Sequence, residues 1–157
     1  MSAAILRKML REKSLLAGFI VDSAGTEALI ECPPDEKTVS VCKDHEIDIS
    51  PHRGQQVTHS MIRDATVVLT MAESHRRIIR GIFPQWESKI LLLKEFGQVD
   101  LPEDLSVEDP TGRARRKYEK TFKELEGEIA RIFPILEDMS CHESGAGDGL
   151  LPKPRTP

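Results

Sequence analysis

Residues 1–17 of this chain have the pattern of an amphipathic helix, and this opening limits the folds available to the rest. Apolar residues recur near the 3.6-residue helical period at Leu6, Met9, Leu10 and Leu16, and charged residues fill most positions between them. Short apolar runs and further helical patterns then alternate, which is typical of an α/β fold with a parallel sheet. Because a helix in such a fold normally connects two parallel strands, the order of elements predicts a strand ahead of this helix.

Apolar segments along the chain are expected to form the strands of the sheet. They are Phe19–Ser23, Ala65–Met71 and Lys89–Leu93. The second segment is rich in β-branched residues, as a strand buried on both faces should be.

Helices are expected between these segments. Asp35 should N-cap a helix that reaches about His45, and Thr58 should cap a short helical turn. A further helix is expected over Ala72–Ile82. The residues that should face inward from it are His75, Ile78, Ile79 and Ile82.

The strongest helical pattern begins at about Arg113. Its buried stripe is expected to contain Tyr118, Phe122, Leu125, Ile129, Ile132 and Leu136. Pro134 should end or kink this helix, because proline has no amide hydrogen and clashes with the preceding turn. Residues 138–157 are rich in Gly, Pro and Ser, so we expect a single domain over residues 1–137 and a disordered tail after it.

Composition argues against several classes of partner. The net charge of −4 provides no general basic surface for nucleic acid. Apolar runs such as Ile90–Leu93 are far too short to span a membrane. Cys32, Cys42 and Cys141 are an odd number at wide spacing, which argues against a disulfide framework or a zinc site. We therefore expect a cytoplasmic protein with no nucleic-acid or membrane partner and no metal, and the oligomeric state stays open.

An Asp-Pro pair lies between the last expected strand and the C-terminal helix. In one interpretation Asp109 N-caps that helix, with Pro110 at its first position. In the other, Asp109 is a general acid on a loop and Pro110 fixes its direction. The arginines that follow either form a solvated face or attract an anionic substrate, and they are Arg113, Arg115 and Arg116.

Four segments in order resemble the low-molecular-weight protein-tyrosine phosphatase family. They are Val21–Thr26, Ile47–Arg53, Asp64–Met71 and Glu108–Pro110, and the likeness covers residues 1 to about 136. It implies a three-layer α/β fold with a parallel four-stranded sheet flanked by helices, here without its first, central strand. It also implies cysteine-phosphate catalysis without a cofactor on a phosphorylated protein. Thr111-Gly112 lacks the aromatic residues that eukaryotic members carry after Asp-Pro, so this chain is more similar to bacterial members, some of which act on phosphoarginine rather than phosphotyrosine.

The resemblance also implies roles for individual residues. Asp109 would protonate the leaving group and then activate water against the phosphocysteine, with Pro110 orienting it. Ser23 and His52 match a serine and a histidine that hydrogen-bond the catalytic loop and hold its shape. Without the resemblance, Ser23 would be a turn residue and His52 an ordinary loop histidine. Ala72 stands where relatives often have an aspartate helix cap, a loss on the order of 1 kcal/mol.

The catalytic loop of the family, C-x5-R-S/T, is absent from these 157 residues. The residues six positions after Cys32, Cys42 and Cys141 are Thr38, Asp48 and Gly147. The nucleophile and the phosphate-binding arginine are therefore missing, and we expect the chain alone to be inactive. We also expect Met1 to be an internal methionine of a longer phosphatase, because strands that lose a central neighbour keep unpaired backbone groups, each costing about 1–3 kcal/mol when buried.

Two other functions stay open. A non-catalytic relative would act as a binding module, or as a subunit whose partner completes the sheet. An arsenate reductase would use the same scaffold, but the thioredoxin-linked versions need extra cysteines near the helix after the third strand. Residues 72–89 contain no cysteine.

Overall fold

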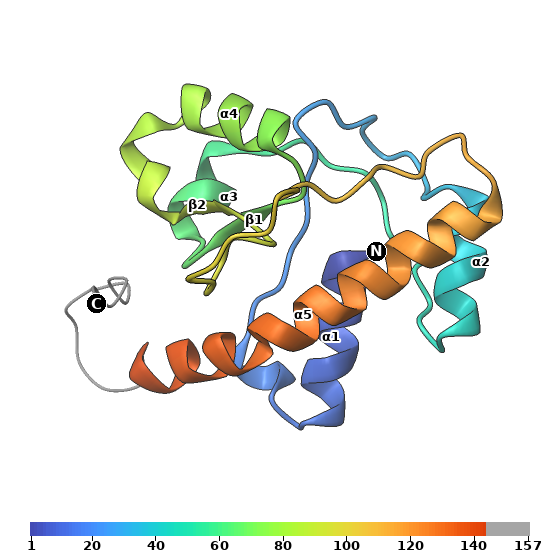
Figure 1. Cartoon of the computed structure of the whole chain (residues 1–157), viewed down its shortest axis with the longest axis horizontal. Coiled ribbons are helices and arrows are strands. Elements are labelled where there is room, and N and C mark those ends of the chain that lie inside the picture. The colour runs from blue at the N-terminus through green and yellow to red at the C-terminus, as the bar shows by residue number, and fades with distance from the viewer. Residues whose placement is uncertain (144–157) are drawn as a thin grey trace.

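Two short parallel strands and a long C-terminal helix organise this chain (Figure 1). The structure, a computed structural model, describes the backbone of residues 1–143 and the side chains of residues 1–140. The elements are α1 (Ser2–Glu12), the 3-10 helix η1 (Leu16–Gly18), α2 (Glu36–Asp44), α3 (His59–Asp64), β1 (Val68–Thr70), α4 (Glu73–Ile82), the 3-10 helix η2 (Pro84–Lys89), β2 (Ile90–Leu92) and α5 (Arg115–Glu143).

Strands β1 and β2 pair in parallel, with Val68 opposite Ile90. Side chains of successive residues point to opposite faces of the sheet. Val68 and Ile90 pack with residues of α3 and α4, whereas Leu69 and Leu91 pack with the larger cluster formed by α1, α2 and α5. Helices therefore flank both faces of the sheet, and the expected α/β class is confirmed (Figure 1).

The segment Phe19–Ser23, expected to be a strand, is extended but unpaired. Phe19 has strand-like angles (φ −130°, ψ 135°), and the chain makes an isolated parallel bridge further on, between Gly25 and Gln56. Ile20 is fully exposed. The expectation is wrong because a strand is defined by hydrogen bonds to a neighbour. In the described part of the chain no strand lies beside this segment, and β1 is paired along one edge only.

Helices α2 and α3 begin where the sequence predicts. The Asp35 carboxylate accepts hydrogen bonds from the backbone amides of Lys37 (2.9 Å) and Thr38 (3.3 Å), and α2 starts at the next residue. The Thr58 hydroxyl caps α3 in the same way. Both caps satisfy amide groups that have no partner inside the helix.

Helix α4 faces the sheet through a different row of residues than predicted. Ile79 is buried as expected. The exposed members of the predicted row are His75, Ile78 (37% exposed) and Ile82 (58% exposed). Arg76 and Arg80 lie on the inward side instead, and Arg80 donates to the Ile90 carbonyl at 2.7 Å. Their long apolar stems cover the sheet while their guanidinium groups reach polar partners at its ends.

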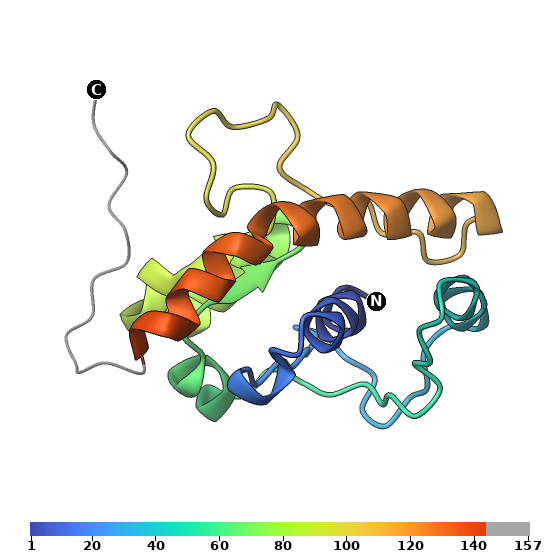
Figure 2. The same cartoon turned by 90° about the horizontal axis from the view of Figure 1, so that it is seen from below.

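Helix α5 supplies the largest part of the core. Every residue predicted for its stripe is buried. The helix continues through Pro134 to Glu143 and bends along its length instead of ending (Figure 2). It thus extends past Asp138, where the tail was expected to begin. Residues 144–157, the rest of that expected tail, lie outside the described residues.

The opening helix is shorter than its sequence pattern. Helix α1 ends at Glu12, and Ser14 adopts a left-handed conformation (φ 59°) that stops helical hydrogen bonding. Ile5 and Leu10 are buried in the core. Leu16 belongs to the separate turn η1. Met1 occupies the N-cap position, and its side chain makes no capping hydrogen bond.

Gly97 offers a test of how the loop after β2 packs against α5. Its φ is +74°, and a Cβ added there would lie 2.0 Å from Ile135 Cδ1. We expect Gly97→Ala to lower the free energy of unfolding by about 1–3 kcal/mol, through backbone strain and overpacking. Gly127→Ala is the matched control, because an added Cβ at this exposed helical position meets no atom within 4 Å. It should raise the free energy of unfolding by about 0.5–1 kcal/mol. Urea unfolding measures both, and equal stabilities would contradict the prediction.

Candidate functional site

A cavity of about 330 Å³ lies along α1, from Met1 to Arg11, and two of the predicted site residues line it. Ser23 enters from the extended segment after η1, and His52 enters from the loop that follows α2. The other lining residues are Met1, Ala3, Ala4, Arg7, Arg11, Pro34, Thr38, Ile47, Asp48, Ile49 and Pro51. The structure thus brings together Ser23 and His52, which lie far apart in the sequence.

Backbone and side-chain hydrogen bonds hold the Ser23 wall of this cavity in place. The Gln55 amide nitrogen donates to the Ser23 carbonyl (2.9 Å) and to the Asp22 carboxylate (2.8 Å), which also accepts from the Ser23 N–H (2.8 Å). Arg7 of α1 donates to the Val21 carbonyl. The extended segment is therefore attached both to the His52 loop and to α1, although no strand pairs with it in the described residues.

The charge of this cavity is mixed, with cationic groups on the α1 side. Arg7 and Arg11 line it, and the N-terminal end of a helix adds a partial positive charge. On the opposite wall, hydrogen bonds from Ser50 lower the pKa of Asp48, so this carboxylate stays ionised. An anion at the helix terminus would be attracted to the α1 side of the cavity.

Asp109 does not line this cavity, and it does not cap α5. Helix α5 begins at Arg115, so the interpretation of Asp109 as its N-cap is wrong. The Asp109 carboxylate instead accepts the backbone N–H of Thr111 at 2.9 Å, inside a tight turn. The Pro110 carbonyl accepts the N–H of Arg113 at 2.9 Å and closes the next turn. Asp109 is exposed at the tip of these two turns, which we call the acid turn (Asp109–Arg113).

The acid turn is attached to the N-terminal end of α2. Lys37 Nζ donates to the Arg113 carbonyl at 2.8 Å and lies over the ring of Tyr118, 5.7 Å from its centroid. The Tyr118 hydroxyl accepts the N–H of Gly112 at 3.2 Å. Because Pro34 and Thr38 of the same end of α2 line the cavity, the acid turn lies beside the α2 wall of the cavity.

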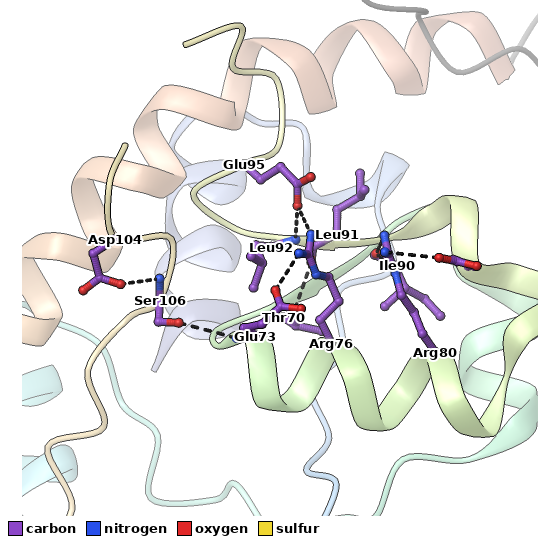
Figure 3. A network of polar contacts seen from close by, with 11 residues as sticks. Thr70, Glu73, Arg76, Arg80, Ile90, Leu91, Leu92, Glu95, Asp104 and Ser106 are labelled. Carbon is purple, nitrogen blue, oxygen red and sulfur yellow. Dashed lines mark hydrogen bonds and ion pairs between the residues drawn. The ribbon is translucent and has the colours of Figure 1, made fainter. Parts of the chain in front are cut away.

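The loop that leads to Asp109 is attached to α4 through Ser106 (Figure 3) and to α5 through Lys94. The Ser106 hydroxyl accepts the N–H of Glu73 at 3.4 Å, and Ala72, the N-cap residue of α4, offers no cap of its own. Lys94 Nζ binds the Ser106 carbonyl and a Glu124 carboxylate oxygen, each at 2.7 Å. Sequence reasoning missed this replacement cap, because Ser106 is 33 residues away from the helix end that it serves.

Arg76 fixes the beginning of α4 to the end of β2 (Figure 3). Its guanidinium pairs with Glu73, 2.5 Å away, and with Glu95. The Glu95 carboxylate also accepts the N–H of Leu92 at 3.3 Å. Among the described residues, Arg76 Nε is buried without a hydrogen-bond partner. This network stiffens the sheet end from which the loop toward Asp109 departs.

Two classes of feature are absent from the described part of the chain. Within it, no three His, Cys, Asp or Glu side chains are grouped so that they could hold a metal ion. Over the same residues, no helix has both the length and the apolarity required to cross a bilayer.

Known proteins with the same sequence features are phosphatases. A family model described as low molecular weight phosphotyrosine protein phosphatase matches residues 1–140. Over 132 residues the chain is 33% identical to the probable low molecular weight protein-tyrosine-phosphatase EpsP of Ralstonia solanacearum, covering 84% of this chain and 78% of that protein.

Solved structures of similar fold carry related names. The low molecular weight protein tyrosine phosphatase from T. tengcongensis is similar with a TM-score of 0.76 and 30% identity, over 85% of this chain and 87% of that one. The YwlE arginine phosphatase from Geobacillus stearothermophilus is similar with a TM-score of 0.77 and 28% identity, over 94% of this chain and 89% of that one.

Tyr118 is the single tyrosine of the chain, so its ionisation can be followed without interference. Burial raises the pKa of its phenol, and the carboxylates of Asp35 and Asp109 raise this pKa further, while the Gly112 N–H lowers it. We expect ultraviolet absorbance to place the pKa above the ordinary value of about 10. Because the unfolded chain would release this proton first, stability should fall as the pH rises above about 10.

Asp35→Asn should lower the Tyr118 pKa, since it removes a negative charge beside the phenolate but keeps an N-cap acceptor for α2. Asp100→Asn, at an exposed loop position, is the control and should leave the pKa unchanged. An unchanged pKa in Asp35→Asn would contradict the arrangement.

Proposed function

Because this chain belongs to the low molecular weight phosphotyrosine protein phosphatase family, we propose that it supports hydrolysis of a phosphorylated protein, with Asp109 as general acid. The observation that carries the proposal is the cavity along α1, whose lining includes the N-terminal end of this helix. Ser23 and His52 line it, and the acid turn is bonded to Lys37, the neighbour of the lining residue Thr38. A phosphoryl group there would meet the positive end of a helix.

The proposed reaction divides the work between two groups. A cysteine thiolate attacks phosphorus and the bond to the leaving atom breaks, while Asp109 gives its proton to that atom, the oxygen of tyrosine or the nitrogen of arginine. Asp109, now a carboxylate, then takes a proton from the water that attacks the phosphocysteine and releases phosphate. Pro110 sets the direction of Asp109. Ser23 and His52 support the loop that carries the thiolate.

The 157 residues contain no cysteine that fits the role of this nucleophile. No cysteine of the chain is followed by arginine at the sixth position. Cys42 is fully buried and burial raises its pKa, so its thiolate is disfavoured. We therefore propose that the 157 residues provide the general acid and the supporting walls, and that a strand followed by a C-x5-R-S loop must be added for turnover.

The substrate is proposed to be a phosphorylated protein carrying phosphotyrosine or phosphoarginine. Both activities occur in the names of similar proteins, EpsP and YwlE. Thr111 and Gly112 place no aromatic side chain beside Asp109. We further propose a cytoplasmic location, because Cys32 and Cys42 are unpaired thiols, as is usual in a reducing compartment.

A second candidate function is a phosphatase-like binding module without catalysis. The absence of a C-x5-R sequence from the 157 residues is the observation that favours it. Such a module would bind a phosphorylated protein or a partner strand and release no phosphate.

We expect the 157-residue chain to hydrolyse p-nitrophenyl phosphate no faster than buffer does. A loop-completed protein, in which an apolar strand and a C-x5-R-S loop are joined in front of Met1, should hydrolyse it. The same protein with the loop cysteine replaced by serine is the control, since it keeps the fold but loses the nucleophile. A folded loop-completed protein without activity would favour the binding module.

In the loop-completed protein, Asp109→Asn should slow turnover of phenyl phosphate by roughly 100-fold or more, because a poor leaving group needs the proton. The loss should be smaller for p-nitrophenyl phosphate, whose leaving group is already acidic. Asp104→Asn, in the preceding loop, is the matched control and should change the turnover rates of both substrates by the same factor. Equal losses for the two substrates in Asp109→Asn would exclude the general-acid role.

A further inference from the structure

Tyr118 stands out among the buried polar groups that the proposed reaction does not use. It is 1% exposed and lies in the first turn of α5, with its hydroxyl directed at the acid turn. A buried hydroxyl needs hydrogen-bond partners, since an unpaired one loses free energy on desolvation. Its oxygen accepts the N–H of Gly112 at 3.2 Å, and Lys37 Nζ, near the start of α2, lies 5.7 Å from the centroid of its ring.

Gly112 is the residue of the acid turn that most needs such an attachment. It has a φ of +77°, and a Cβ added there would contact no atom within 4 Å. Glycine in this left-handed region has wide conformational freedom, and the surroundings here do not restrict it by contact. The hydrogen bond to Tyr118 therefore restricts the backbone of Gly112, three residues after Asp109.

The other contacts of the acid turn leave Asp109 itself weakly held. Its carboxylate accepts the N–H of Thr111, which belongs to the same turn and moves with it. Lys37 binds the turn at its far end, through the Arg113 carbonyl, and its amine is on a long flexible chain. Before the turn, the Thr121 hydroxyl donates to the Glu108 carbonyl at 3.4 Å. Between Glu108 and Arg113, the Gly112–Tyr118 bond connects the turn to the buried core.

We propose that Tyr118 is a positioning residue for Asp109: its buried phenol oxygen accepts the Gly112 N–H and fastens the acid turn to the first turn of α5. The catalytic meaning of this attachment rests on the proposed function of Asp109. The attachment itself does not, because it joins parts of the chain that are all present in the 157 residues. General-acid catalysis depends on placing the proton within hydrogen-bond reach of the leaving oxygen, so a loosened turn would lower proton transfer in particular.

The first test uses the 157-residue chain and Tyr118→Phe, which removes one oxygen and keeps the ring. Hydrogen exchange at the Gly112 amide, followed by NMR, should become roughly three- to tenfold faster, as the loss of one hydrogen bond predicts. The Thr111 amide shift should follow the ionisation of Asp109 in the parent chain and respond less in the variant. Thr70→Val is the matched control: it removes another buried hydroxyl, one that bonds the Leu91 carbonyl, and should change neither signal.

The second test separates positioning from stability in the loop-completed protein. Tyr118→Phe should slow phenyl phosphate turnover more than p-nitrophenyl phosphate turnover, and adding Asp109→Asn should cause little further loss. Thr70→Val should affect both substrates alike. Unchanged Gly112 exchange and Thr111 response in a folded Tyr118→Phe chain would overturn the proposal, as would additive losses with Asp109→Asn. If the loop-completed protein is inactive, the proposed function fails, and the amide signals alone decide whether Tyr118 fastens the turn.

Discussion

Helix α5 packs its buried stripe against α1, α2 and the inner face of the sheet, and most of the molecule is arranged around this contact. The stripe runs from Tyr118 to Leu136, and each large apolar side chain in it contributes about 1.5–3 kcal/mol through burial. A single such contribution is a sizeable part of a typical domain stability of about 5–15 kcal/mol. A sheet of two short strands could not by itself hold the surrounding helices in place, so α5 acts as the template.

Polar residues of α5 bind the loops that lie beside this helix. Arg131 donates to the carbonyls of Leu93 (2.9 Å) and Phe96 (2.7 Å), and Glu124 pairs with Lys94, which in turn binds the carbonyl of Ser106. At the N-terminal end, Tyr118 binds the acid turn. The chain from β2 to Asp109 is therefore attached to one helix at several points, which explains how a long irregular segment keeps one conformation.

Sequence patterns predicted the class of the fold and the starts of α2 and α3, because these depend on local chemistry. Asp35 and Thr58 cap helices through their own side chains, and the stripe of α5 follows from its period. Features that depend on distant partners were not predictable. Phe19–Ser23 has the composition of a strand, but its neighbour decides whether it becomes one. Arg76 faces inward because it pairs with Glu95 in the turn after β2, and Arg80 because it donates to the Ile90 carbonyl in β2. The helical pattern of α4 contains no sign of these acceptors.

The candidate site was likewise predictable only in part. The resemblance to a family named Ser23, His52 and Asp109, and the cavity gathers the first two from segments far apart in sequence. The attachments of Asp109 came from the structure alone, since Ser106, Lys37 and Tyr118 act on residues 6 to 76 positions away. Each of these attachments joins elements that are all within the described residues. The placement of Asp109 therefore rests on contacts within the described residues, with the acid turn bonded to Lys37 of α2 and Tyr118 of α5. Each attachment made before the site is assembled lowers the ordering cost of assembling it.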